Sequence, residues 1–293
     1  MAENKESGVS LIVATLAACD LRPLLDSLET QTCPDYECII VDQSPAQKAE
    51  TVVKGYRNIK YVHSLRKGNS FNRNIGIAHA RYPFLGFPDD DCYYAPDVIE
   101  KVLRAFSASS AETAGVSGVW MDSITGELAM GSKTAKRANW IDVWSSVTNL
   151  TLFLRAGVVR DVKGYDESFG LGSDFFRGGE ETDLTLKVLE TGNNIIYHPE
   201  IVVWHRQDKY VLNKPEKQWG YEEAWGALFR KWSSRGPRQG LIRCAFLFFL
   251  CRSFLAACLW MLRGNHQYAN LYWNKNRARF AGWSKYGRQV NRK

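Results

Sequence analysis

Three consecutive carboxylates, Asp89, Asp90 and Asp91, follow a short apolar run that begins at Phe84. Such a run is typical of a buried strand, and the carboxylates would lie where that strand leaves the sheet, which is where ligands of open α/β sheets bind. Adjacent carboxylates repel one another and favour a divalent cation, which could in turn hold a diphosphate. The cluster therefore predicts a site for Mg²⁺ or Mn²⁺. The alternative is a solvated acidic loop that stabilises the helix after it.

A second acidic cluster consists of Glu180, Glu181 and Asp183, at the start of a segment with helical apolar spacing that ends near Gly192. One of these carboxylates could act as a general base. The first turn of a helix also stabilises carboxylates through the helix dipole, so a purely structural role is the alternative. Both interpretations stay open.

Arg73 lies in a segment from Gly68 to Gly76 that is rich in small and polar residues. Such a segment would let the start of a helix pass close to a ligand. The guanidinium fork of Arg73 could then pair with phosphate oxygens. A surface arginine with a structural partner is the alternative.

The elements that must position these residues alternate between strands and helices. Apolar runs predict strands at residues 9–14, 36–41, 59–63, 84–87, 114–120, 150–154, 194–197 and 201–204. One-face apolar spacing predicts helices at residues 21–30, 45–54 and 71–80, and others from residues 96 and 180. This alternation predicts βαβ units, a mostly parallel sheet and an α/β fold. The first two strands end at Thr15 and Asp42, where a base or ribose could be bound.

Two stretches between these elements are typical of loops. Residues 122–144 are polar, basic and aromatic without periodicity, which favours a loop near an acceptor site. Residues 169–179 contain four glycines and three phenylalanines, a composition typical of a flexible loop that faces a sugar.

In their order and spacing these motifs resemble the family 2 glycosyltransferases, whose fold is called GT-A. The resemblance covers residues 9–205, about two-thirds of the chain. Beside the first strand it rests on four motifs: Ile39-Ile40-Val41-Asp42-Gln43-Ser44, Arg73-Asn74, Asp89-Asp90-Asp91 and Gly178-Gly179-Glu180-Glu181-Thr182-Asp183-Leu184. The resemblance implies a Rossmann-like central sheet flanked by helices, and a nucleotide-sugar donor.

The resemblance also implies roles for the strand-end residues. Asp42 and Asp89 would bind the nucleoside of the donor, and we place Thr15, Asp90 and Arg73 at the nucleotide with them. The first strand of this chain ends in Ala14-Thr15, where the family more often has a polar pair.

The metal and the base follow from the same resemblance. Asp91 would bind the metal that bridges the donor diphosphate, together with Asp89. Related transferases can use a histidine placed like His205 to complete the metal site or to contact the diphosphate, although a lone histidine can equally be structural. The second acid of the glutamate pair, Glu181, would be the base. This chain has glutamate where aspartate is commoner, so Glu180 and Asp183 remain candidates.

Charge is divided unevenly along the chain. Residues 224–293 contain 14 Lys and Arg and no Asp or Glu, whereas the whole chain has 38 basic and 31 acidic residues. We therefore expect a GT-A domain at residues 1–220 and a basic, helical, membrane-associating region at residues 221–293 that seeks an anionic surface. Residues 1–8 are polar and do not read as a signal peptide, so we expect the protein on the cytoplasmic side. Seven scattered cysteines without a CxxC pair predict reduced thiols.

An apolar run at residues 241–262 contains 19 apolar residues out of 22. Arg252 lies near its middle, which would cost about 2.5–3.5 kcal/mol in a membrane span. We favour a helix or helical hairpin that lies in the membrane interface, with basic and aromatic residues at the headgroups. A membrane span and a helix packed on the catalytic domain are the alternatives.

Together these features predict an inverting, metal-dependent glycosyltransferase that moves a sugar from a nucleotide-sugar, with a UDP-sugar as the favoured donor, to a hydroxyl of a lipid-linked or growing glycan. It would act at the inner face of an anionic membrane, without a nucleic-acid partner. One alternative is a sugar-1-phosphate nucleotidyltransferase, although residues 14–22 are not the Gly-rich basic loop typical of that class. The other is a nucleic-acid-binding protein that uses the basic tail, which would leave both acidic clusters unexplained.

Overall fold

The structure is a computed structural model of the chain, and it describes residues 7–17, 20–206, 215–236 and 238–290. The chain divides into two compact units. The first, here the sheet unit, is Met1–Glu167 with Glu181–Gln207, and the second, the helical unit, is Ser168–Glu180 with Asp208–Lys293. The expected boundary at residue 220 falls inside helix α8 (Pro215–Trp232). Residues 1–6, on which most of the signal-peptide argument rests, lie outside the described residues.

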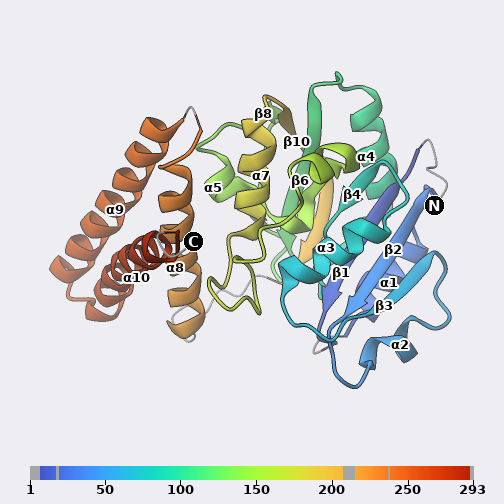
Figure 1. Cartoon of the computed structure of the whole chain (residues 1–293), viewed down its shortest axis with the longest axis horizontal. Helices are drawn as coiled ribbons and strands as arrows, with labels where there is room; N and C mark the ends of the chain where they lie inside the picture. The colour runs from blue at the N-terminus through green and yellow to red at the C-terminus, as the bar shows by residue number, and fades with distance from the viewer. Residues whose placement is uncertain (1–6, 18–19, 207–214, 237, 291–293) are drawn as a thin grey trace. The chain divides into compact units, whose positions relative to one another are not determined.

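A ten-stranded sheet forms the centre of the sheet unit (Figure 1). Its main strand order is β3-β2-β1-β4-β9-β6-β10-β5, with β7 paired to β6 and β8 paired to β10. The strands are β1 (Val9–Thr15), β2 (Tyr36–Asp42), β3 (Ile59–His63), β4 (Phe84–Gly86), β5 (Tyr93–Tyr94), β6 (Thr113–Asp122), β7 (Leu128–Met130), β8 (Lys136–Arg137), β9 (Leu152–Arg155) and β10 (Asn194–His205). The predicted α/β architecture is confirmed.

The direction of the strands changes along the sheet. β3, β2, β1 and β4 run parallel, as the alternating strands and helices predict. Beyond β4 the sheet is mixed, because β9 runs antiparallel to both β4 and β6, while β10 runs parallel to β6. Two strands expected at residues 194–197 and 201–204 are in fact one strand, β10. A register shift against β6 between Tyr197 and Val202 accommodates Pro199 without ending the strand.

Helices cover both faces of the sheet because apolar residues of β1 point in alternate directions. The buried side chains of Leu11 and Val13 share one core with α1 (Arg22–Glu29) and α4 (Val98–Ser107). Ile12 points to the other face, where α3 (Asn69–His79) crosses β1; a Cβ added at Gly76 of α3 would overlap Ile12. The small residues of α3 therefore let the helix approach the sheet itself.

The remaining helices of the sheet unit are short, apart from α7 (Glu180–Glu190). They are α2 (Lys48–Val53), α5 (Val143–Ser146) and α6 (Ala156–Asp161), with one 3₁₀ turn at Asn149–Thr151. The stretch 122–144, expected as a loop, contains β7, β8 and the start of α5. β7 pairs with the preceding strand β6, and β8 pairs with β10, which is distant in sequence; this pairing supplies the order that local periodicity does not show.

Three helices make up most of the helical unit: α8, α9 (Gln239–Leu262) and α10 (His266–Val290). α8 and α10 approach closely at two glycines, since a Cβ at Gly226 would overlap the backbone of Arg279 and one at Gly282 would overlap that of Glu223. The buried Arg279 then joins all three helices. Its guanidinium donates to Glu222 Oε2 of α8 at 2.7 Å and to Phe249 O and Ser253 Oγ of α9 at 2.9 Å.

The apolar run 241–262 forms one continuous helix, α9, in place of a hairpin. In the part of the chain that the structure describes, α9 alone is long and apolar enough to cross a membrane, which by itself is weak support for a span because core helices meet the same criterion. One side of α9 packs within the helical unit, and the other side is exposed.

Candidate functional site

The three predicted carboxylates lie beyond the end of β4, and each has a different partner in the sheet unit. The Thr15 hydroxyl at the end of β1 donates to Asp90 Oδ2 at 2.5 Å. Arg73 of α3 donates to Asp89 Oδ1 at 2.9 Å. The third carboxylate, Asp91, lies 2.9 Å from Nε2 of His205, the last residue of β10. The site is thus assembled from β1, β4, β10 and α3.

Asp89, Asp91 and His205 form a possible metal site. Each offers one ligand atom, and these atoms lie within 4.8 Å of one another. Two carboxylates and an imidazole are a suitable donor set for Mg²⁺ or Mn²⁺. The geometry therefore fits the divalent metal that the sequence predicts, without identifying which metal it is.

The negative charges of this cluster are only partly balanced by the positive groups beside them. Desolvation raises the pKa of Asp89, the neighbouring Asp91 and Asp90 raise it further, and Arg73 and His205 oppose the shift. The pKa of Asp90 is also raised, by desolvation and by Asp91, while the hydrogen bond from Thr15 opposes this shift. Both shifts indicate that the cluster would gain from an added positive charge.

Asp42 is placed differently from the other strand-end residues. It is fully buried at the end of β2, and its carboxylate accepts hydrogen bonds from the backbone N–H of Ser44 at 2.7 Å and of Ala49 at 3.0 Å. The hydroxyl of Tyr61 donates to it at 3.2 Å. Burial, together with the negative charge of Asp42, raises the pKa of Tyr61 to about 12. Asp42 therefore fixes the turn that follows β2.

Arg73 contacts the carboxylate cluster, and the neighbouring Asn74 binds the backbone of Tyr165. The buried side chain of Arg73 reaches Asp89, and its guanidinium lies 5.6 Å from the centre of the Tyr165 ring. Asn74 holds the backbone of Tyr165 from both sides: its amide donates to Tyr165 O at 3.0 Å, and its Oδ1 accepts from Tyr165 N at 2.9 Å. Sequence analysis assigns no role to Tyr165, because Asn74 lies 91 positions away from it in the chain.

The acids of α7 differ in their access to solvent. Asp183 is fully buried, 3.5 Å from Lys187 Nζ, and Lys187 also donates to Gly164 O at 2.9 Å. This arrangement ties α7 to the turn before Tyr165. Glu180 is also buried, whereas Glu181 is partly exposed. Among the three predicted candidates, Glu181 is the one that is partly exposed to solvent.

Comparison with known proteins gives a family for part of the chain. Residues 10–154 match the family model described as glycosyl transferase family 2. The match includes Thr15, Asp42, Arg73 and the three consecutive aspartates, and it ends before α7 and His205.

Several curated relatives share the same region. EpsH of Bacillus subtilis, named as a glycosyltransferase, is 35% identical over 101 residues, which are 33% of this chain and 29% of EpsH. The pre-mycofactocin glycosyltransferase of Mycobacterium tuberculosis is 25% identical over 201 residues, covering 64% of this chain and 40% of that protein. This chain thus spans well under half of the length of both relatives.

Solved structures match more of the chain. TarS of S. aureus has a TM-score of 0.62 and 19% identity, covering 84% of this chain and 43% of TarS. A shorter TarS chain in complex with UDP gives the same TM-score at 18% identity, with 84% of this chain and 72% of that chain covered. At this identity the likeness establishes the fold. The family match and the relatives named as glycosyltransferases show that this chain belongs to the family 2 glycosyltransferases.

Proposed function

We propose that the protein transfers a sugar from a nucleotide-sugar donor, a UDP-sugar, to a hydroxyl of a lipid-linked or growing glycan. The observation that carries this proposal is the convergence of Asp89, Asp91 and His205 within 4.8 Å, beside Arg73. The UDP complex of TarS, a structural neighbour, supports uridine diphosphate as the nucleotide.

In this proposal the strand ends bind the donor. Thr15, Asp42 and Asp90 border the nucleoside, with Asp42 holding the turn after β2 in shape. Arg73, which pairs with Asp89, would contact the phosphate oxygens of the donor, a geometry that its guanidinium fork suits.

A divalent cation would be held by Asp89, Asp91 and His205. When bound, it would neutralise the charge that develops on the departing diphosphate. His205 is well suited to this place because its other neighbours fix it: the Trp120 ring packs edge-on against it at 5.1 Å, and Trp120 Nε1 donates to His205 O at 2.9 Å.

Glu181 is the proposed general base. The acceptor oxygen attacks the anomeric carbon and loses its proton to the Glu181 carboxylate. The bond from that carbon to the diphosphate oxygen breaks, and its electron pair leaves with the diphosphate. Direct displacement inverts the anomeric centre. Glu180 and Asp183 would then support α7 from buried positions.

Thermal unfolding with nucleotides tests this proposal. Full-length protein is heated with UDP, GDP or CDP, each with and without Mn²⁺, in parallel with Asp91→Asn and with Asp161→Asn, an exposed aspartate of α6, as the control. We expect stabilisation by UDP that needs Mn²⁺, about 2.7 kcal/mol at 100 times the dissociation constant, and that only Asp91→Asn loses. If no nucleotide stabilises the protein, the proposal is wrong.

The partner that we propose for the exposed side of α9 is an anionic membrane surface. Large apolar side chains line this side, including Leu247, Phe248 and Leu255, which are 59%, 61% and 66% exposed. At 100° per residue, Arg243 and Arg252 fall at its two edges. The guanidinium of Arg243 donates to Ser233 O at 3.0 Å, whereas the stem of Arg252 can lie on the apolar surface while its guanidinium reaches lipid phosphates.

Charge favours lipid over a second copy of the chain at this surface. Residues 224–293 contain no Asp or Glu, so two copies of α9 would bring arginine edges together without acidic partners from this stretch. The packed side of α9 also contacts the charged Arg279 of α10, which opposes a membrane span by the intact helical unit.

Vesicle sedimentation tests this surface. We expect binding to vesicles with phosphatidylglycerol and weaker binding to pure phosphatidylcholine. A Phe248→Ser, Leu255→Ser double variant should lose at least about tenfold in vesicle affinity, because burying each of the two side chains contributes about 1.5–3 kcal/mol to the free energy of binding. Leu65→Ser, at an 88% exposed residue of the sheet unit, is the matched control. Self-association without vesicle binding would contradict the proposal.

A further inference from the structure

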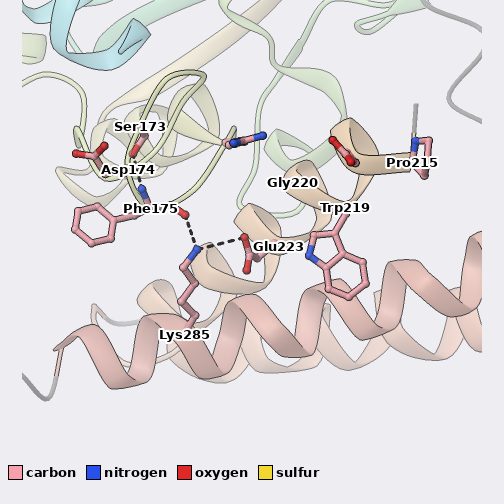
Figure 2. A pocket seen from close by; sticks show the side chains of 10 residues that line it. Ser173, Asp174, Phe175, Pro215, Trp219, Gly220, Glu223 and Lys285 are labelled. Atoms are coloured by element: carbon pink, nitrogen blue, oxygen red, sulfur yellow. Dashed lines mark hydrogen bonds and ion pairs between the residues drawn. The ribbon is translucent and has the colours of Figure 1, made fainter. Parts of the chain in front are cut away.

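The helical unit has a pocket of about 790 Å³, a volume within the usual range of small-molecule sites. Figure 2 shows the loop at residues 173–177 beside the first turns of α8, with Lys285 reaching up from α10. The lining residues are Ser173, Asp174, Phe175, Arg177, Pro215, Glu216, Trp219, Gly220, Glu223 and Lys285.

The loop that forms one wall is firmly attached within the helical unit. Phe169 and Phe176 stack at 5.2 Å, and the ring of Tyr286 lies 6.3 and 6.2 Å from them. Lys285 donates to Phe175 O at 2.8 Å (Figure 2). Gly178 has a positive φ of 153° and lies against Tyr221. The composition that predicts a flexible loop therefore belongs to a packed one, and the pocket has a built wall.

Polar groups and one aromatic face are available in this pocket. The side chains of Asp174, Arg177 and Glu216 are exposed, and among the described residues they make no hydrogen bond or ion pair. Trp219, 37% exposed, supplies an indole face on the α8 side. An aromatic face beside carboxylates and a guanidinium matches a pyranose, whose C–H face packs on the ring while its hydroxyls bond to the charged groups.

The charge of the pocket decides between sugar and phosphate. Lys285 is shared between Glu223, at 3.5 Å, and the loop, which leaves two carboxylates, Asp174 and Glu216, against Arg177 alone. A pocket with this balance repels phosphate and anionic sugars, whereas a neutral carbohydrate binds without a charge penalty.

We infer that this pocket binds an uncharged carbohydrate and, resting on the glycosyltransferase function proposed above, that it holds part of the acceptor glycan. The sequence links the two roles directly, since the loop that supplies Arg177 runs into the start of α7, where the proposed base Glu181 follows four positions later.

Saturation-transfer NMR on the full chain tests the pocket, with cellobiose, lactose and chitobiose as probes and inorganic phosphate as competitor. We expect at least one disaccharide to bind, phosphate to leave the signal unchanged, and Trp219→Ala and Glu216→Gln to weaken binding at least tenfold. Trp273→Ala, which removes a 50% exposed tryptophan of α10 outside the pocket, should bind normally. Circular dichroism of each variant reports whether it is folded.

Two further outcomes separate this inference from the proposed function. UDP with Mn²⁺ should stabilise Trp219→Ala as it does the parent chain, because the variant leaves the donor site intact. Disaccharide binding without any nucleotide response would retain the carbohydrate pocket and overturn its assignment to the acceptor. No binding by any of the three disaccharides, or equal binding by Trp219→Ala, would overturn the inference itself.

Discussion

Two charged clusters, one in each unit, show how the same residue types serve different ends. Beyond β4, three carboxylates crowd together with one arginine and one histidine, and Asp89 and Asp91 keep 40% and 45% of their side chains exposed. In the helical unit, the buried Arg279 is joined at 2.7 Å to Glu222, whose side chain is 12% exposed, and Lys275 and two α9 oxygens complete the set. The first, here called the open cluster, leaves negative charge for a ligand to neutralise. The second, here called the closed cluster, holds helices together.

Removing Arg279 is the strongest test of whether the closed cluster holds the helices together. Arg279→Ala leaves the largely covered Glu222 without its main partner and leaves two acceptors on α9 without their donor, so we expect the free energy of unfolding to fall by about 3–5 kcal/mol. Urea denaturation followed by circular dichroism measures the loss. Arg277→Ala, on the exposed side of the same helix, should change it by less than about 0.5 kcal/mol. Similar effects of both variants would show that the cluster does not join the helices.

The open cluster should respond in the opposite way. Asp91→Asn removes one of the crowded negative charges, so we expect the unliganded protein to be as stable as the parent or slightly more stable. The same change should remove the metal-dependent nucleotide stabilisation of about 2.7 kcal/mol. Calorimetry with and without UDP and Mn²⁺ gives both numbers. A variant that is destabilised without ligand would place Asp91 among the structural charges.

Adding a methyl group between α8 and α10 should lower the stability of the helical unit by a smaller amount. Gly226→Ala inserts a methyl group into the backbone of Arg279, an overpacking that should cost about 1–3 kcal/mol. Gly240→Ala in α9, where a Cβ meets open space, is the control and should be neutral or stabilising. Thermal unfolding distinguishes them, and equal melting temperatures would argue against close packing of the two helices.

Thr15→Val tests the weakest contact of the open cluster. The change preserves shape but removes the hydroxyl that donates to Asp90 and accepts from Ala17 N at 2.7 Å, so we expect a loss of about 1 kcal/mol in stability and weaker nucleotide binding. Isothermal titration with UDP and Mn²⁺ measures the binding. Unchanged affinity would remove Thr15 from the donor site.

Sequence analysis predicts the open cluster better than the closed one for a physical reason. Asp89, Asp90 and Asp91 are adjacent, and a buried strand places them at a sheet edge whatever the rest of the chain does. Their partners are also strand or helix residues with local signals, so Arg73 and His205 could be named in advance, although their roles stay predictions.

The closed cluster depends on contacts that no local pattern encodes. Arg279 is one of 14 cations in residues 224–293, and Ser253 reads only as an interruption of an apolar run until the arginine is seen to donate to it. No local pattern predicts the burial of Asp183 beside Lys187 or the hydrogen bonds between Asn74 and Tyr165 either. The parallel part of the sheet, β3-β2-β1-β4, could be predicted from the sequence. The antiparallel direction of β9, next to β4, could not.

The helical unit is discontinuous in the sequence, and this limits how the chain can be divided. Its short piece, Ser168–Glu180, precedes α7, and its long piece begins at Asp208. Ending the chain after β10 would remove Tyr286, Lys231 and Lys285, which pack on or bond to the loop, and would leave Phe169 and Phe176 uncovered. A catalytic fragment obtained by truncation, or a chimera with another tail, would therefore have to replace the loop as well as the helices.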